Sequence, residues 1–160
     1  MYRHILLCTD GSDLAMEGAN HGIALAKSLN AKVTCVTVTA PYHAVVIAPD
    51  AAQQIESNLA EVHGQQMRAL ASSYLAGARE AADAAGVPCD TVHAEHARPH
   101  AAILDVARSR GCDLIVMASH GRGGLAAMVL GSETLKVLTH GTTPVVVVPP
   151  PKPAAYFAAS

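Results

Sequence analysis

The stretch from residue 117 to residue 134 reads MASHGRGGLAAMVLGSET and has the residue types of an anion-binding loop. It overlaps the apolar run LIVM at residues 114–117, which is typical of a buried strand, and it precedes an amphipathic helical pattern. Glycines in a strand-to-helix loop let backbone N–H groups approach a ligand closely. The start of the helix offers unpaired donors and a positive dipole end. Phosphate is the anion that this arrangement suits.

Three side chains in this stretch add to its binding chemistry. Ser132 is expected to begin the helix as its N-cap or to turn its hydroxyl toward the anion. Arg122 supplies a charged donor, and His120 either contacts the ligand or braces the turn. The glycines match neither Gly-x4-Gly-Lys-Ser/Thr nor Gly-x-Gly-x2-Gly. On the glycines alone, an ordinary turn followed by a capped helix stays open as the alternative.

The composition favours one domain and excludes several classes of protein. A length of 160 residues suits a single α/β domain at residues 1–149, with a disordered tail expected at residues 150–160. No apolar run is long enough to span a bilayer and no signal-peptide pattern is visible, so we expect a cytoplasmic protein. A net charge of -2 and 3% aromatic residues disfavour nucleic acid as a partner. Without Cys-x2-Cys spacing, the four cysteines are expected to be reduced core residues.

Strand and helix patterns alternate along the chain. The strands are predicted at residues 4–9, 32–39, 89–95, 113–118 and 144–148. The helices are predicted to run from a turn at residues 10–13 to residue 30, and over residues 50–85, 99–110 and 132–140. The long helix has an apolar side formed by Ile55, Leu59, Val62, Leu70 and Tyr74.

This alternation predicts an α/β fold, an open doubly wound five-stranded parallel sheet with helices on both faces, which is Rossmann-like. With the strand order 3-2-1-4-5, the order reverses between the first and fourth strands, and ligands bind beyond the carboxyl ends of strands at such a reversal. The loops there begin at Thr9 and Asp10 after the first strand and at residue 117 after the fourth. The sequence therefore predicts that two chemically interesting loops meet in one crevice.

The residues from about 2 to 148 resemble a universal stress protein domain. Nucleotide-binding members of that family carry Gly-x2-Gly-x9-Gly-Ser/Thr after the fourth strand, and the same register here reads Ala118-x2-Gly121-x9-Gly131-Ser132. The flanking LIVM and PVVVV runs and Asp10 also match. Ala118 is the departure from the pattern. It is harmless if its φ is negative and straining if its φ is positive.

The resemblance implies an ATP site that works with Mg²⁺. Asp10 would meet the ribose or the nearby water and metal, and the main chain around Val38 would frame the adenine. A carboxylate beside a polyphosphate makes most sense with Mg²⁺ between them. The path toward the phosphates would be lined by Met117, Ala118 and Gly121, and the phosphates would be held through backbone amides and hydroxyls by Gly131, Ser132, Glu133 and Thr134.

The function expected from this resemblance is an ATP-binding stress-response protein that acts as a nucleotide-dependent sensor or regulator for an unidentified downstream protein. Hydrolysis should be slow at most, because no base is placed to activate water. The family also pairs through its last strand, and the apolar edge Val145–Val148 suits a homodimer. Coverage of that edge by the tail is the alternative.

Other chemistries can be read from the sequence. A non-nucleotide interaction module of the same family is supported by Ala118 alone. Ser119 lies in half of a Gly-x-Ser-x-Gly hydrolase elbow, but the acid and the histidine that follow are only Glu133 and His140. A further group, His93, His96 and His100, lacks the spacing of a metal site, so these histidines are expected to be solvated or ordinarily hydrogen-bonded.

Overall fold

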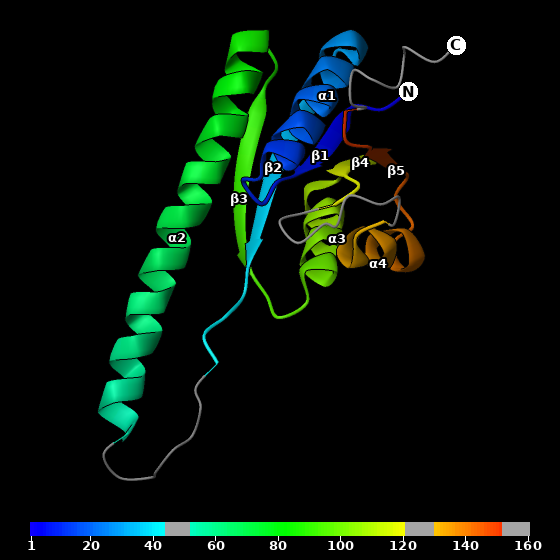
Figure 1. The fold of residues 1–160 in the computed structure, drawn as a ribbon. Coiled ribbons are helices and arrows are strands. Elements are labelled where there is room, and N and C mark those ends of the chain that lie inside the picture. The colour runs from blue at the N-terminus through cyan, green and yellow to red at the C-terminus, as the bar shows by residue number, and fades with distance from the viewer. Residues whose placement is uncertain (44–51, 121–129, 152–160) are drawn as a thin grey trace, which may run out of the picture.

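The computed structural model describes residues 1–43, 52–120 and 130–151, in which strands and helices alternate (Figure 1). The predicted residues Gly121 and Arg122, and the tail from residue 152 onward, lie outside the described residues. The predicted ends of the elements agree with the structure to within one or two residues. The elements are β1 (His4–Cys8), α1 (Asp13–Leu29), β2 (Lys32–Thr39), α2 (Ala52–Ala85), β3 (Cys89–Glu95), α3 (Pro99–Arg110), β4 (Leu114–Ala118), α4 (Ser132–His140) and β5 (Val145–Val148).

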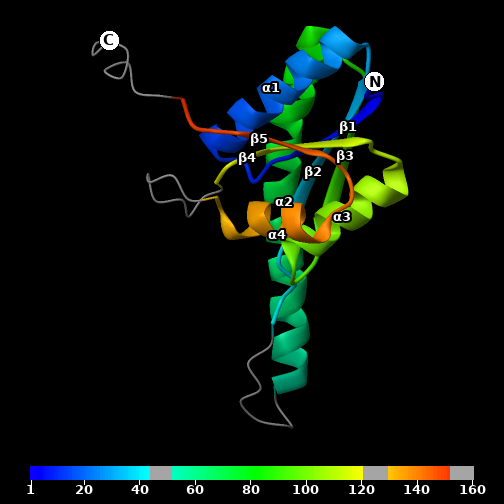
Figure 2. The same cartoon turned by 90° about the vertical axis from the view of Figure 1, so that its right-hand side faces the viewer.

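The five strands form one parallel sheet in the order β3-β2-β1-β4-β5, which confirms the predicted topology. The helices α1 and α2 cover one face of the sheet and α3 and α4 cover the other (Figure 2). Each face has its own apolar core, because strands buried on both sides are apolar along nearly their whole length. The strand order reverses between β1 and β4, so the loops after these strands share one edge of the sheet.

Local signals set most helix ends. The Ser12 hydroxyl accepts a hydrogen bond from the Ala15 amide and caps α1, which ends at Asn30 in the left-handed conformation. Pro99 occupies the first turn of α3, where its missing N–H costs nothing, and Gly111 ends that helix with a φ of 66°. These are the residue types from which the ends were predicted.

The apolar side expected for α2 is not its buried side. Leu59 and Val62 are 49% and 50% exposed, because the N-terminal half of α2 extends beyond the sheet (Figure 1). The face that packs on the sheet is instead made of small and apolar residues of the C-terminal half, namely Ala71, Leu75, Ala78 and Ala82. Both faces contain apolar residues at helical spacing, so periodicity alone does not choose between them. Among the described residues, no helix has the length and apolarity needed to cross a bilayer.

Candidate nucleotide site

The loop after β1 is fixed by hydrogen bonds of its own polar residues. The Thr9 amide donates to Val36 O at 3.0 Å, and the Thr37 hydroxyl donates to Thr9 O at 3.0 Å. The Asp10 carboxylate accepts hydrogen bonds from the Ser12 amide at 3.0 Å and from the Ser12 hydroxyl at 2.6 Å. These contacts hold the Asp10 carboxylate at the carboxyl edge of the sheet, where it was predicted to act.

Gly11 allows this loop to pass under α2. Its φ is 75°, a conformation that glycine adopts without steric cost. A Cβ at this position would lie 2.1 Å from Cδ1 of the Tyr74 ring. Tyr74 is therefore packed directly over the backbone beside Asp10. The sequence placed Tyr74 only on an apolar helix side and gave no signal for this contact.

The loop after β4 and the start of α4 are joined by two hydrogen bonds. The Gly131 amide donates to Ser119 O at 2.7 Å, and the Thr134 hydroxyl donates to Ala118 O at 3.2 Å. Thr134 is buried and 4% exposed, so its hydroxyl is part of the joint between helix and strand. The first turn of α4 is thereby fixed at the carboxyl end of β4.

Gly131 is the N-cap of α4, so the prediction that Ser132 caps the helix was wrong, while its alternative, a Ser132 hydroxyl turned toward an anion, stays a prediction. Gly131 has extended backbone angles and no capping side chain, while its carbonyl accepts the first helical hydrogen bond from Leu135. The reason is the Gly131–Ser119 hydrogen bond, which fixes where the chain turns into the helix. The amides of residues 132–134 then form the first turn, whose N–H groups lack partners within the helix itself.

Ala118 does not strain the loop. Asn30 is the one residue other than glycine with a positive φ in the part of the chain that the structure describes, so the φ of Ala118 is negative. The Ala118 methyl lies on the side of α1, where Gly18 provides the space: a Cβ on Gly18 would be 3.5 Å from the Ala118 Cβ. Ala118 is thus accommodated in this backbone without strain.

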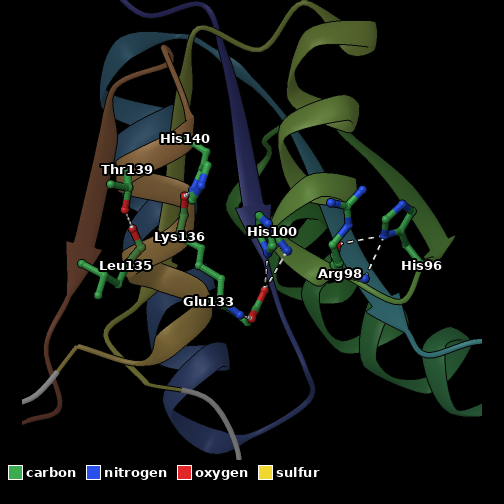
Figure 3. Close-up of polar contacts among 8 residues, drawn as sticks. All are labelled: His96, Arg98, His100, Glu133, Leu135, Lys136, Thr139 and His140. Atoms are coloured by element: carbon green, nitrogen blue, oxygen red, sulfur yellow. Dashed lines mark hydrogen bonds and ion pairs between the residues drawn. The ribbon is translucent and has the colours of Figure 1, made fainter.

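The Glu133 side chain turns away from the first turn of its own helix. Its Oε2 accepts hydrogen bonds from the His100 amide at 2.9 Å and from His100 Nδ1 at 3.0 Å, and its Oε1 accepts one from Lys136 Nζ at 2.7 Å (Figure 3). Partial burial raises the pKa of the Glu133 carboxyl, but the hydrogen bonds from Lys136 and His100 outweigh that effect and hold the pKa below its ordinary value. Glu133 is therefore a carboxylate near neutral pH.

The other predicted residues lie at the same edge of the sheet. The register pairs Cys8 with Val36 and Leu7 with Val116, so Val38 and Ala118 each lie two residues beyond the last position that their strand pairs with β1. Met117 is buried in the core beneath α3 and α4. The nitrogen Nδ1 of His120 lies 3.0 Å from Ser119 Oγ. The predicted residues that the structure describes thus lie in or just after β1, β2 and β4 and at the start of α4, which all meet the same edge of the sheet.

The residues of a hydrolase triad are not assembled. Ser119 is 6% exposed and is hydrogen-bonded to His120, whereas His140 Nδ1 is bonded to Lys136 O and Glu133 to His100 and Lys136. The histidines weighed as metal ligands also make separate contacts: His93 with Thr39, His96 with Arg98 and His100 with Glu133. The described residues contain no group of three or more side chains suited to hold a metal ion.

A model of the universal stress protein family matches residues 1–149 of this chain. Universal stress protein MJ0531 of Methanocaldococcus jannaschii is 32% identical over 152 residues, which cover 95% of this chain and 85% of that protein.

Solved structures share the fold. The structure of the protein MJ0577 superimposes with a TM-score of 0.79 at 23% identity, covering 96% of this chain and 99% of that one. A universal stress protein in complex with cAMP has a TM-score of 0.64 at 23% identity, covering 92% and 96% of the two chains. A third structure, from Archaeoglobus fulgidus in complex with dAMP, has a TM-score of 0.55 at 18% identity, covering 91% and 97%.

Proposed function

Because the chain belongs to the universal stress protein family, we propose that it binds ATP with Mg²⁺ and acts in the cytoplasm as a nucleotide-dependent regulator of a protein partner in the stress response. The observation that carries the proposal is the position of the first turn of α4, which is fixed at the carboxyl end of β4, the strand next to the one that the Asp10 loop follows. Amides there can hold phosphates, and the Asp10 carboxylate can hold Mg²⁺ through the phosphates or water. The cAMP and dAMP in two structures of the same fold support an adenine nucleotide.

The polar groups around this site suit binding more than catalysis. Asp10 accepts hydrogen bonds from Ser12, His120 is bonded to Ser119, and Glu133 is turned toward α3. These contacts fix the directions of the three described groups, and we propose that none of them serves as the general base that hydrolysis needs. ATP hydrolysis should therefore be slow at most. The non-nucleotide reading loses its one sequence argument, because Ala118 does not strain the loop.

The test is to denature freshly purified protein, identify released nucleotide by mass, and titrate the emptied protein with Mg-ATP by calorimetry. We expect an adenine nucleotide to be released and saturable binding of about one ATP per chain. Competition by cAMP and AMP then ranks the adenine ligands. If no nucleotide is released and neither ATP, AMP nor cAMP binds, the chain is an interaction module of its family and the proposed function is wrong.

We propose in addition that two chains pair through β5. This strand is one edge of the sheet, and its residue Val146 is 37% exposed. An open groove lies beside it, between β5 and the α1 residues Glu17, Asn20 and His21. Exposed apolar edge strands are normally covered or paired, and an antiparallel copy of the same strand across a twofold axis covers this one.

Replacing Val146 with lysine should convert the dimer to a monomer, because the pairing would bring two like charges together in an apolar interface. Analytical ultracentrifugation measures the change. The matched control is Leu59→Lys, which places the same charge on an exposed apolar residue of α2. If Leu59→Lys is monomeric and Val146→Lys remains a dimer, the dimer interface lies on α2 and not on β5.

A further inference from the structure

The first turn of α4 carries a carboxylate at the place where the proposed function puts phosphate. With Gly131 as the N-cap, Glu133 is the second helical residue. A helix N-terminus favours an anion, but a carboxylate and a polyphosphate at the same turn repel each other. The direction of the Glu133 side chain therefore bears directly on how well this turn accepts phosphate.

The carboxylate is directed to another helix. Arg98, the N-cap of α3, makes no side-chain capping bond, and Glu133 supplies the missing acceptor by taking the hydrogen bond of the His100 amide. The His100 ring donates a second bond to the same carboxylate oxygen (Figure 3). The charge of Glu133 is thus held by the positive end of α3 instead of facing the start of α4.

The His100 ring is the more buried of the two side chains that donate to Glu133. Its side chain is 14% exposed, whereas Lys136 is 45% exposed and pairs with Glu133 three residues away on the same helix. Exposed pairs of that kind contribute little to holding a geometry. The His100 ring is itself held in place by the ring of His140, with 5.5 Å between the ring centroids. Removing the His100 ring should therefore loosen the carboxylate, which would keep only the hydrogen bonds from the His100 amide and from Lys136.

We propose that His100 is a positioning residue of the nucleotide site, which keeps the Glu133 carboxylate on the N-terminus of α3 and so leaves the first turn of α4 to the phosphates of the ligand. The inference rests on the proposed function, and it concerns the phosphate charge of the ligand and not its adenine base. Loss of His100 then weakens binding more for a ligand with more phosphates.

The experiment compares Mg-ATP, AMP and adenosine on the wild-type protein and on His100→Ala by calorimetry. We expect a loss of about tenfold in affinity for ATP and about threefold for AMP, with the affinity for adenosine unchanged. The conservative variant His100→Asn should keep most of the ATP affinity, because its side-chain amide can still donate to Glu133. His100→Leu, which fills the space without donating, should behave like His100→Ala.

The decisive variant is His100→Ala combined with Glu133→Gln. Without the carboxylate there is no charge to release, so the double variant should regain ATP affinity to within about twofold of wild type. Arg108→Ala is the control, since it removes an exposed ion pair with Asp105 on the same helix. Equal losses for ATP and adenosine, or no recovery in the double variant, would mean that His100 only stabilises the fold. Absence of ATP binding by the wild-type protein would overturn the proposed function and this inference together.

Discussion

Replacing Gly131 with glutamate should lower the affinity for Mg-ATP by about a hundredfold while the protein remains folded. The backbone of Gly131, with φ of −56° and ψ of 147°, is open to any residue, so the substitution creates no backbone strain. A side chain there would lie close to the loop, since a Cβ would be 3.2 Å from Ser119 O and 3.4 Å from His120 Cα. The new carboxylate would stand beside the amides that are proposed to hold phosphate, and a repulsion of roughly 2–3 kcal/mol corresponds to the expected loss.

Two controls separate the effect of a charge at this position from the effect of side-chain size and from the effect of the protein's total charge. Gly131→Ala adds only the methyl group and should cost less than about tenfold in ATP affinity, because the neighbouring loop must shift by a few tenths of an ångström. Gly64→Glu adds the same charge on α2, where the nearest side chain is Arg68, and should leave ATP binding unchanged. If Gly131→Glu binds Mg-ATP as tightly as wild type, the nucleotide is not held at the start of α4.

Much of the fold is predictable because its signals are local. Asparagine or glycine ends the helices at residues 30, 86 and 111, proline begins one at residue 99, and the apolar run of β4 is buried along its whole length. The buried face of α2 was not predictable in the same way, because alanines such as Ala78 and larger residues such as Leu59 repeat at the same helical spacing. Which face meets the sheet depends on where the sheet ends, and that is a tertiary property.

The candidate site is likewise predictable from local sequence only in part. The positions of Asp10 and Gly131 follow from the strand order and the motif, but the start of α4 and the direction of Glu133 depend on long-range partners. The Ser119 carbonyl oxygen accepts a hydrogen bond from the Gly131 amide and so fixes the N-cap. The His100 amide, on another helix, donates a hydrogen bond to the Glu133 carboxylate. The sequence of residues 131–134 alone does not indicate either of those hydrogen-bond partners. The sign of φ at Ala118 was likewise open until the backbone was known.

Replacing Gly11 with alanine should destabilise the protein by about 3 kcal/mol, the largest loss of stability that we expect from a single added methyl group. The backbone of Gly11 has a positive φ, which costs an alanine roughly 1–2 kcal/mol. The methyl group would also meet the Tyr74 ring at 2.1 Å, so α2 or the loop must move, and overpacking of this kind costs about 1–3 kcal/mol. Urea unfolding monitored by circular dichroism measures the free energy of unfolding.

Gly86 offers a matched control for the backbone cost alone. Its φ is 72°, close to the 75° of Gly11, but no atom lies within 4 Å of a Cβ placed there. Gly86→Ala should therefore cost only about 1–2 kcal/mol, and the difference between the two variants measures the Tyr74 contact. Adding Gly11→Ala to a Tyr74→Ala background should likewise cost only the backbone strain. Equal losses at Gly11 and Gly86 would mean that Tyr74 can move aside freely, and that α2 does not hold the Asp10 loop in place.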